Sequence, residues 1–122
     1  MEDLEAVAAD TIDAALFLHR RIGPGLLESV YEVLLAAELN QGGHHVVRQQ
    51  PVDFVFNGMR FDAAFRVDLI VDGRLVIEIK SVERLTAVHT KQLLTYLRLM
   101  EQPLGLLMTL VAKRSGKGSG EW

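Results

Sequence analysis

The segment from Arg66 to Lys80 constrains the fold more than any other part of the chain, because it is typical of two strands joined by a tight turn. Suppose that the turn consists of residues 72–74, with Gly73 in a left-handed conformation. The strand residues then pair so that Val71 faces Leu75. Extended along both strands, this register places Asp68 opposite Glu78.

The hydrophobic pattern of this hairpin supports that register. One face would carry only apolar residues: Val67, Leu69, Val71, Leu75, Ile77 and Ile79. The other face would carry Arg66, Asp68, Ile70, Val76, Glu78 and Lys80. A two-residue turn would shift the pairing by one and move Asp68 onto the apolar face. The pattern therefore selects the three-residue turn and predicts two carboxylates side by side.

The rest of the chain supplies the elements around this hairpin. Periodicity predicts helices over residues 3–22, 26–41 and 86–100, and strands over 46–56, 59–71, 74–81 and 104–111. In the second helix, the stripe predicted to face the core is Leu27, Val30, Tyr31, Leu34 and Leu35. Pro51 predicts an edge strand or a bulge. This order predicts an α/β (α+β) domain over residues 1–112, a mixed sheet of about four strands flanked by helices, followed by a flexible tail over 113–122.

Composition narrows the function classes. The chain has no cysteine, which excludes disulfides and thiol chemistry. The acidic N-terminus lacks a signal-peptide layout, and no apolar run approaches the roughly 20 residues that span a bilayer. We therefore expect a cytoplasmic protein with no membrane partner. The net charge of −3 is unfavourable for nucleic-acid binding. Carboxylates that hold a cation weaken this objection, because the cation neutralises their charge.

The predicted carboxylate pair indicates a hard cation. Opposed side chains in a sheet have Cβ atoms about 5 Å apart, so Asp68 and Glu78 would repel each other without a positive charge between them. Oxygen ligands suit Mg²⁺ or Mn²⁺, which can also take a phosphate oxygen. Lys80, on the same face, would orient an attacking water or stabilise charge on the phosphate. The structural alternative is a solvated polar face with a Lys–carboxylate pairing.

Two motifs together resemble a known group of enzymes. Asp68 followed by Glu78-Ile79-Lys80 resembles the D…ExK signature of the PD-(D/E)XK nuclease superfamily. The segment 25–31, GLLESVY, resembles the motif of its GxxExxY family. The resemblance covers roughly residues 11–110. It implies a restriction-endonuclease-like core of order αβββαβ and a Mg²⁺-dependent nuclease that hydrolyses DNA phosphodiester bonds.

The resemblance also implies roles for individual residues. Asp68 and Glu78, with the backbone carbonyl of Ile79, would hold the metal, and Lys80 would assist the attacking water. Glu28 would be an additional acid at the metal, and its structural alternative is a helix N-terminal carboxylate favoured by the helix dipole. The QxxxY element at 92–96 would place Gln92 and Tyr96 at the substrate phosphates or the metal-bound water, and its structural alternative is a polar helix face half-covered by a loop. Tyr31 would also position substrate, or else be a core residue with its hydroxyl hydrogen-bonded.

A second class of function stays open at this stage. The same fold can serve as a non-catalytic module for oligomerisation or partner binding, with a homodimer as the simplest assembly. DNA is the expected partner in the enzyme hypothesis, since no aromatic stacking platform or RNA-binding motif is present. The intact D…ExK residues favour the enzyme.

Overall fold

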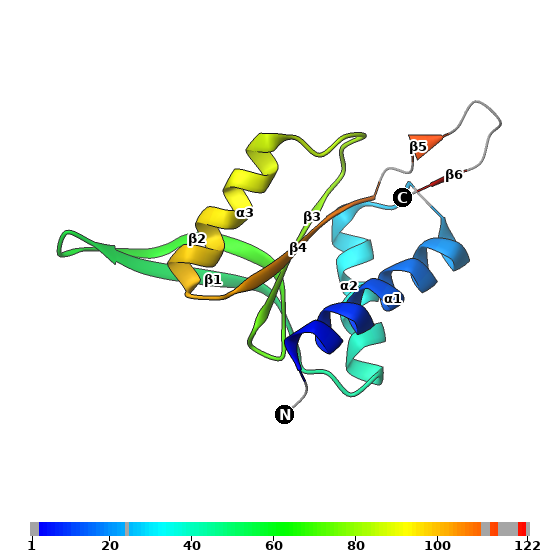
Figure 1. Cartoon of the computed structure of the whole chain (residues 1–122), viewed down its shortest axis with the longest axis horizontal. Coiled ribbons are helices and arrows are strands. Elements are labelled where there is room, and N and C mark those ends of the chain that lie inside the picture. Colours follow the sequence, from blue (N-terminus) through cyan, green and yellow to red (C-terminus); the bar gives the residue numbers. More distant parts are fainter. Residues whose placement is uncertain (1–2, 24, 111–112, 115–119, 122) are drawn as a thin grey trace.

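The computed structural model describes residues 3–23, 25–110, 113–114 and 120–121. The elements in chain order are α1 (Leu4–Ile22), α2 (Glu28–Gln41), β1 (Val46–Phe56), β2 (Met59–Val71), β3 (Leu75–Lys80), α3 (Ala87–Met100), β4 (Leu104–Thr109), β5 (Lys113–Arg114) and β6 (Gly120–Glu121) (Figure 1). Strands β1 to β4 form one sheet in that order, with β1, β2 and β3 antiparallel and β4 parallel to β3. The predicted fold class, with a mixed four-stranded sheet flanked by helices, is confirmed.

The register of the central hairpin is the one that the hydrophobic pattern predicts. Leu69 pairs with Ile77, and Val71 pairs with Leu75. The turn consists of three residues, and the N–H of Arg74 donates to the carbonyl of Val71 at 3.1 Å. Asp72 and Gly73 have φ angles of 54° and 68°, so the left-handed conformation extends to both residues.

Helices cover both faces of the sheet. Helices α1 and α2 pack on one face, where the strands contribute Leu69, Val71, Leu75, Ile77 and Ile79 to the larger core cluster. Helix α3 packs on the other face, in a smaller cluster made of Val52, Val67, Val76, Leu93 and Leu97. Figure 1 shows the β1–β2 hairpin extending beyond the helices on the side of the molecule away from α1 and α2. The β2–β3 hairpin therefore lies between two hydrophobic layers.

Two details of the predicted core are wrong. Val67 packs with the α3 cluster and not with Leu69, because the alternation of side chains breaks at Asp68, beside Gln49 with its φ of 53°. Leu27, which precedes α2 in an extended conformation, is 71% exposed, and Val30 of α2 is 42% exposed. The buried positions of α2 are Tyr31, Glu32, Leu35, Ala36 and Leu39. Apolar residues surround much of this helix, so periodicity alone does not single out the stripe that meets the sheet.

The four-stranded sheet has two edge strands. Strand β1, which contains Pro51, is an edge of the sheet, as predicted. Strand β4 is the other edge of the four-stranded sheet. Of the predicted flexible tail over 113–122, only the short antiparallel strands β5 and β6 are described, and residues 115–119 and 122 lie outside the described residues. None of the described helices has the length and apolar character that crossing a bilayer requires.

Gly105 on β4 allows α3 to pack closely against the sheet. A Cβ atom added there would lie 3.0 Å from Cδ1 of Leu93 and 3.2 Å from Cδ2 of Leu97. We expect Gly105→Val to destabilise the protein by about 1–3 kcal/mol, because the well-packed layer cannot accept the added volume without shifting α3. Thermal unfolding measures this effect. Leu94→Ala, at an exposed position of the same helix, is the control and should stay within about 0.5 kcal/mol of wild type.

Candidate functional site

The carboxylates of Asp68 and Glu78 are interlocked where β2 and β3 separate. The paired register ends at Leu69 and Ile77. Beyond it, the backbone N–H of Asp68 donates to Oε2 of Glu78 at 3.0 Å, and the N–H of Ile79 donates to Oδ2 of Asp68 at 2.7 Å. Side-chain oxygens thus take the places of backbone acceptors at this position. The arrangement holds both carboxylates at one point between the two strands.

Glu78 is in an unfavourable place for a negative charge. Its side chain is 4% exposed. Burial, and then the charge and side-chain hydrogen bonding of Asp68, raise the pKa of Glu78 to about 7, although the backbone hydrogen bond from Asp68 and the charge of Lys80 act in the opposite direction. With both carboxylates ionised, the pair needs more positive charge than Lys80 supplies. The pair is therefore suited to a bound cation.

Lys80 and two side chains of α3 lie beside this pair. The Nζ of Lys80 donates to Oε1 of Gln92 at 3.0 Å. Tyr96, one turn further along α3, stacks on Phe65 of β2 with ring centroids 4.0 Å apart. Burial, followed by the charges of Glu78 and Asp68, raises the pKa of the Tyr96 hydroxyl. The structure therefore brings Gln92 and Tyr96 to the same side of the sheet as the carboxylates and Lys80.

Glu28 and Tyr31, two of the three residues that the GxxExxY pattern specifies, lie at different places. Glu28 is the first residue of α2, and its Oε1 accepts a hydrogen bond of 2.6 Å from the N–H of Ser81, just beyond β3. Tyr31 is buried in the core, where its hydroxyl donates to the carbonyl of Ala15 at 2.9 Å and where burial raises its pKa. The hydrogen bond of Glu28 thus connects the start of α2 to the residue that follows β3. The placement of Tyr31 favours a structural role, as a core residue with a hydrogen-bonded hydroxyl, over a role in positioning substrate.

The pair offers few oxygen ligands to a divalent cation. Among the described residues, no group of three or more His, Cys, Asp or Glu side chains is arranged to hold a metal ion, so Glu28 does not complete a three-carboxylate site. Ile79 directs its N–H toward Asp68, and the carbonyl of a strand residue points to the same side as its N–H. Two carboxylates and one carbonyl suit Mg²⁺ or Mn²⁺, which keep several waters and bind few protein groups. The residues present therefore fit such an ion.

The sequence patterns did not predict three polar residues near the pair, which are Glu32, Arg48 and Gln49. Glu32 of α2 is 3% exposed, and its carboxylate accepts hydrogen bonds from Arg48 and Gln49 of β1. The Nε2 of Gln49 also lies 3.4 Å from Oδ1 of Asp68. A charged residue flanked by Tyr31 and Leu35 on the buried side of a helix was the available signal.

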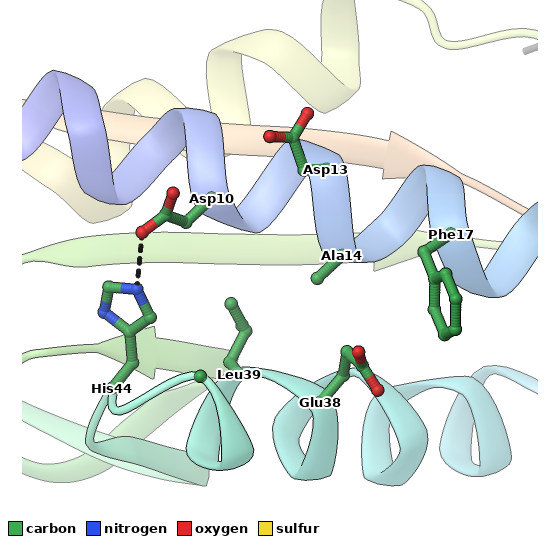
Figure 2. A pocket seen from close by; sticks show the side chains of 8 residues that line it. Asp10, Asp13, Ala14, Phe17, Glu38, Leu39 and His44 are labelled. Atoms are coloured by element: carbon green, nitrogen blue, oxygen red, sulfur yellow. Dashed lines mark hydrogen bonds and ion pairs between the residues drawn. The ribbon is translucent and has the colours of Figure 1, made fainter.

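A second polar cluster lies elsewhere, between α1 and α2. Figure 2 shows His44 pointing toward Asp10, and their Nε2 and Oδ2 atoms are 2.9 Å apart. The Nδ1 of His44 is 2.6 Å from Oδ2 of Asp72, so the imidazole joins α1 to the turn of the central hairpin. The adjoining cavity has a volume of about 410 Å³ and contains none of the predicted site residues. We assign this cluster to the packing of α1 against the hairpin.

One comparison with known proteins found a match. The family model described as the PD-(D/E)XK nuclease superfamily matches residues 5–118, which is most of the chain. Searches of curated proteins and of solved structures found no match. The matched region contains α1 without its first residue and all elements from α2 to β4, so it includes the interlocked pair and its neighbours. The chain belongs to the PD-(D/E)XK nuclease superfamily.

Proposed function

We propose that this protein is a metal-dependent nuclease that hydrolyses phosphodiester bonds of DNA, and that it belongs to the GxxExxY group of the superfamily. The observation that carries the proposal is the interlocked pair of Asp68 and Glu78 at the separation of β2 and β3, with Lys80 following on the same strand. A carboxylate as buried as that of Glu78, placed beside a second carboxylate, is costly in a protein that does not use it. Superfamily membership supports the same chemistry.

In this proposal, Asp68, Glu78 and the carbonyl of Ile79 hold Mg²⁺ or Mn²⁺. A bound divalent ion would polarise a phosphoryl oxygen and make a bound water more acidic. Glu78 binds metal in its ionised form, and the pKa of about 7 means that the ion competes with a proton for this carboxylate near neutral pH. Glu28, held at the end of β3, supports the strand that carries these ligands.

The remaining polar residues act on the substrate. Lys80 places its ammonium beside the pair, where it orients the attacking water and stabilises the negative charge that grows on the phosphate. Gln92 keeps this ammonium in place through the 3.0 Å hydrogen bond. Tyr96 presents a phenol that stays protonated, because its pKa is raised, and so can donate a hydrogen bond to a phosphate oxygen. Exposed Arg84, Lys91 and Arg98 supply positive charge for the DNA backbone.

Nucleic acid cleavage with and without metal tests the proposal. Supercoiled plasmid, linear duplex, single-stranded DNA and RNA of the same sequence are incubated with Mg²⁺ or Mn²⁺, and parallel samples contain a chelator. We expect DNA cleavage that needs the metal and is lost in Asp68→Asn. The matched control is Asp53→Asn, an exposed carboxylate of β1 that pairs with Arg60, which should cleave like wild type.

Each other outcome has a defined meaning. Cleavage of RNA alone would keep the chemistry and replace the substrate. Cleavage that survives both Asp68→Asn and the chelator would exclude the carboxylate pair as the site. If neither nucleic acid is cleaved although the wild type is folded, the non-catalytic binding module replaces the nuclease as the better account.

A further inference from the structure

Glu32 is a buried carboxylate directed at the candidate site from α2. Its Oε2 forms an ion pair with Nη2 of Arg48 at 2.9 Å and accepts a hydrogen bond from Nε of Arg48 at 3.1 Å. Its Oε1 accepts a hydrogen bond of 2.6 Å from Nε2 of Gln49. A buried charge is kept only where it is paired and fully hydrogen-bonded, and both oxygens of Glu32 meet that condition. Gln49 is thereby hydrogen-bonded to a carboxylate that Arg48 also holds in position.

Gln49 has a strained backbone. Its φ is 53°, a left-handed conformation that residues with a Cβ atom seldom adopt. It lies between Arg48 and Gln50, which pair with Leu69 and Val67 of β2, so Gln49 stands opposite Asp68. Strain of this kind persists only where the surroundings impose it, and it gathers at functional sites. Here it coincides with a side chain that reaches both Glu32 and Asp68.

The amide of Gln49 lies between the two carboxylates. Its Nε2 is 2.6 Å from Oε1 of Glu32 and 3.4 Å from Oδ1 of Asp68. The other oxygen of Asp68, Oδ2, accepts the N–H of Ile79. Both oxygens of Asp68 are therefore oriented by donors from neighbouring strands, one from β1 and one from β3. The longer contact to Oδ1 leaves lone-pair capacity on that oxygen for a cation.

We propose that Glu32 and Gln49 are positioning residues for Asp68: Glu32 anchors the amide of Gln49, and the amide holds Oδ1 of Asp68 in the orientation that binds the metal. This inference rests on the proposed function. Groups that orient a metal ligand without touching the ion commonly change metal affinity or activity by about 10- to 100-fold when they are removed. A purely structural ion pair between Glu32 and Arg48 would change the stability of the fold and leave the orientation of Asp68 unaffected.

The experiment compares four variants with wild type. Gln49→Gly removes the amide and also permits the positive φ, so it separates loss of the side chain from backbone strain. Glu32→Leu removes the anchor, and Glu32→Gln keeps an acceptor oxygen for the Gln49 amide. Gln50→Ala is the matched control, since the amide of Gln50 donates to the carbonyl of Pro51. Mn²⁺ affinity, kcat and KM for DNA, and the NMR signal of the Ile79 amide are measured for each folded variant.

Gln49→Gly should weaken Mn²⁺ binding and lower kcat by about tenfold or more with little change in KM, and it should shift the Ile79 amide signal. Glu32→Leu should do the same, Glu32→Gln should retain most of the wild-type behaviour, and Gln50→Ala should be unchanged. Wild-type affinity and an unshifted Ile79 signal in Gln49→Gly would overturn the inference while the nuclease proposal stands. If the wild type neither binds metal nor cleaves DNA, the proposed function fails, and the Ile79 signal still decides whether Gln49 orients Asp68.

Discussion

Replacing Glu78 with Gln will lower the rate of metal-dependent cleavage by about 10³-fold or more. It will also stabilise the metal-free protein at pH 8. Under the proposed function, activity falls because the variant loses a charged ligand of a metal that would supply several kcal/mol to the transition state. Stability rises because burial and the neighbouring Asp68 make an ionised Glu78 unfavourable. The amide oxygen of the new side chain still accepts the N–H of Asp68, so the hydrogen bond is kept.

The size of this stability change depends on pH. The folded pKa of Glu78 is about 7, above the ordinary value of 4.5, so the wild type loses stability as pH rises from 4.5 to 7 and then levels off. A shift of that size corresponds to a penalty on the order of 3 kcal/mol. In thermal unfolding without metal, the variant should have a Tm several degrees higher than that of wild type at pH 8. This difference should vanish near pH 4. A variant less stable than wild type at pH 8 would contradict this account of Glu78.

Replacing Lys80 with Met will lower kcat for DNA cleavage by about 10²- to 10⁴-fold while metal affinity stays within a few-fold of wild type. The methionine keeps most of the apolar stem and removes the ammonium, whose hydrogen bond goes to Gln92 and not to a carboxylate. Metal titration and single-turnover cleavage separate the two effects.

A matched control for Lys80 is available on α3. Lys91→Met removes an exposed ammonium next to Gln92 in sequence, and we expect it to raise KM modestly through lost phosphate attraction, with kcat unchanged. If Lys80→Met cleaves DNA at the wild-type rate, Lys80 has no part in the chemistry. If it loses metal binding as completely as a carboxylate variant, its role is to balance the charge of the pair.

The sequence predicted those parts of the site that depend on side-chain alternation along a strand and on spacing along a helix. Side chains alternate along a strand, so the apolar residues of the hairpin selected one register, and Asp68 and Glu78 met as a result. The helical spacing of Gln92 and Tyr96 likewise placed both on one side of α3, and the structure brings that side to Lys80. Neither inference required knowledge of contacts between distant segments.

The part that the sequence did not predict depends on tertiary contacts. Glu32 and Gln49 meet because α2 packs beside β1 and because Gln49 adopts a positive φ, and neither fact follows from propensity or periodicity. The same break in alternation moves Val67 to the opposite cluster from Leu69. The exposure of Val30 has a related cause, since the burial of an apolar helix residue depends on which neighbour the helix meets.

Calorimetric titration of Mn²⁺ into the wild type and into Glu78→Ala tests the central claim most directly, because it asks whether the interlocked carboxylates bind a metal before any substrate is chosen. The account predicts saturable binding to the wild type at pH 8 that is absent in a folded Glu78→Ala variant. Binding that is unchanged in Glu78→Ala, or no binding to the wild type at millimolar Mn²⁺, would contradict it.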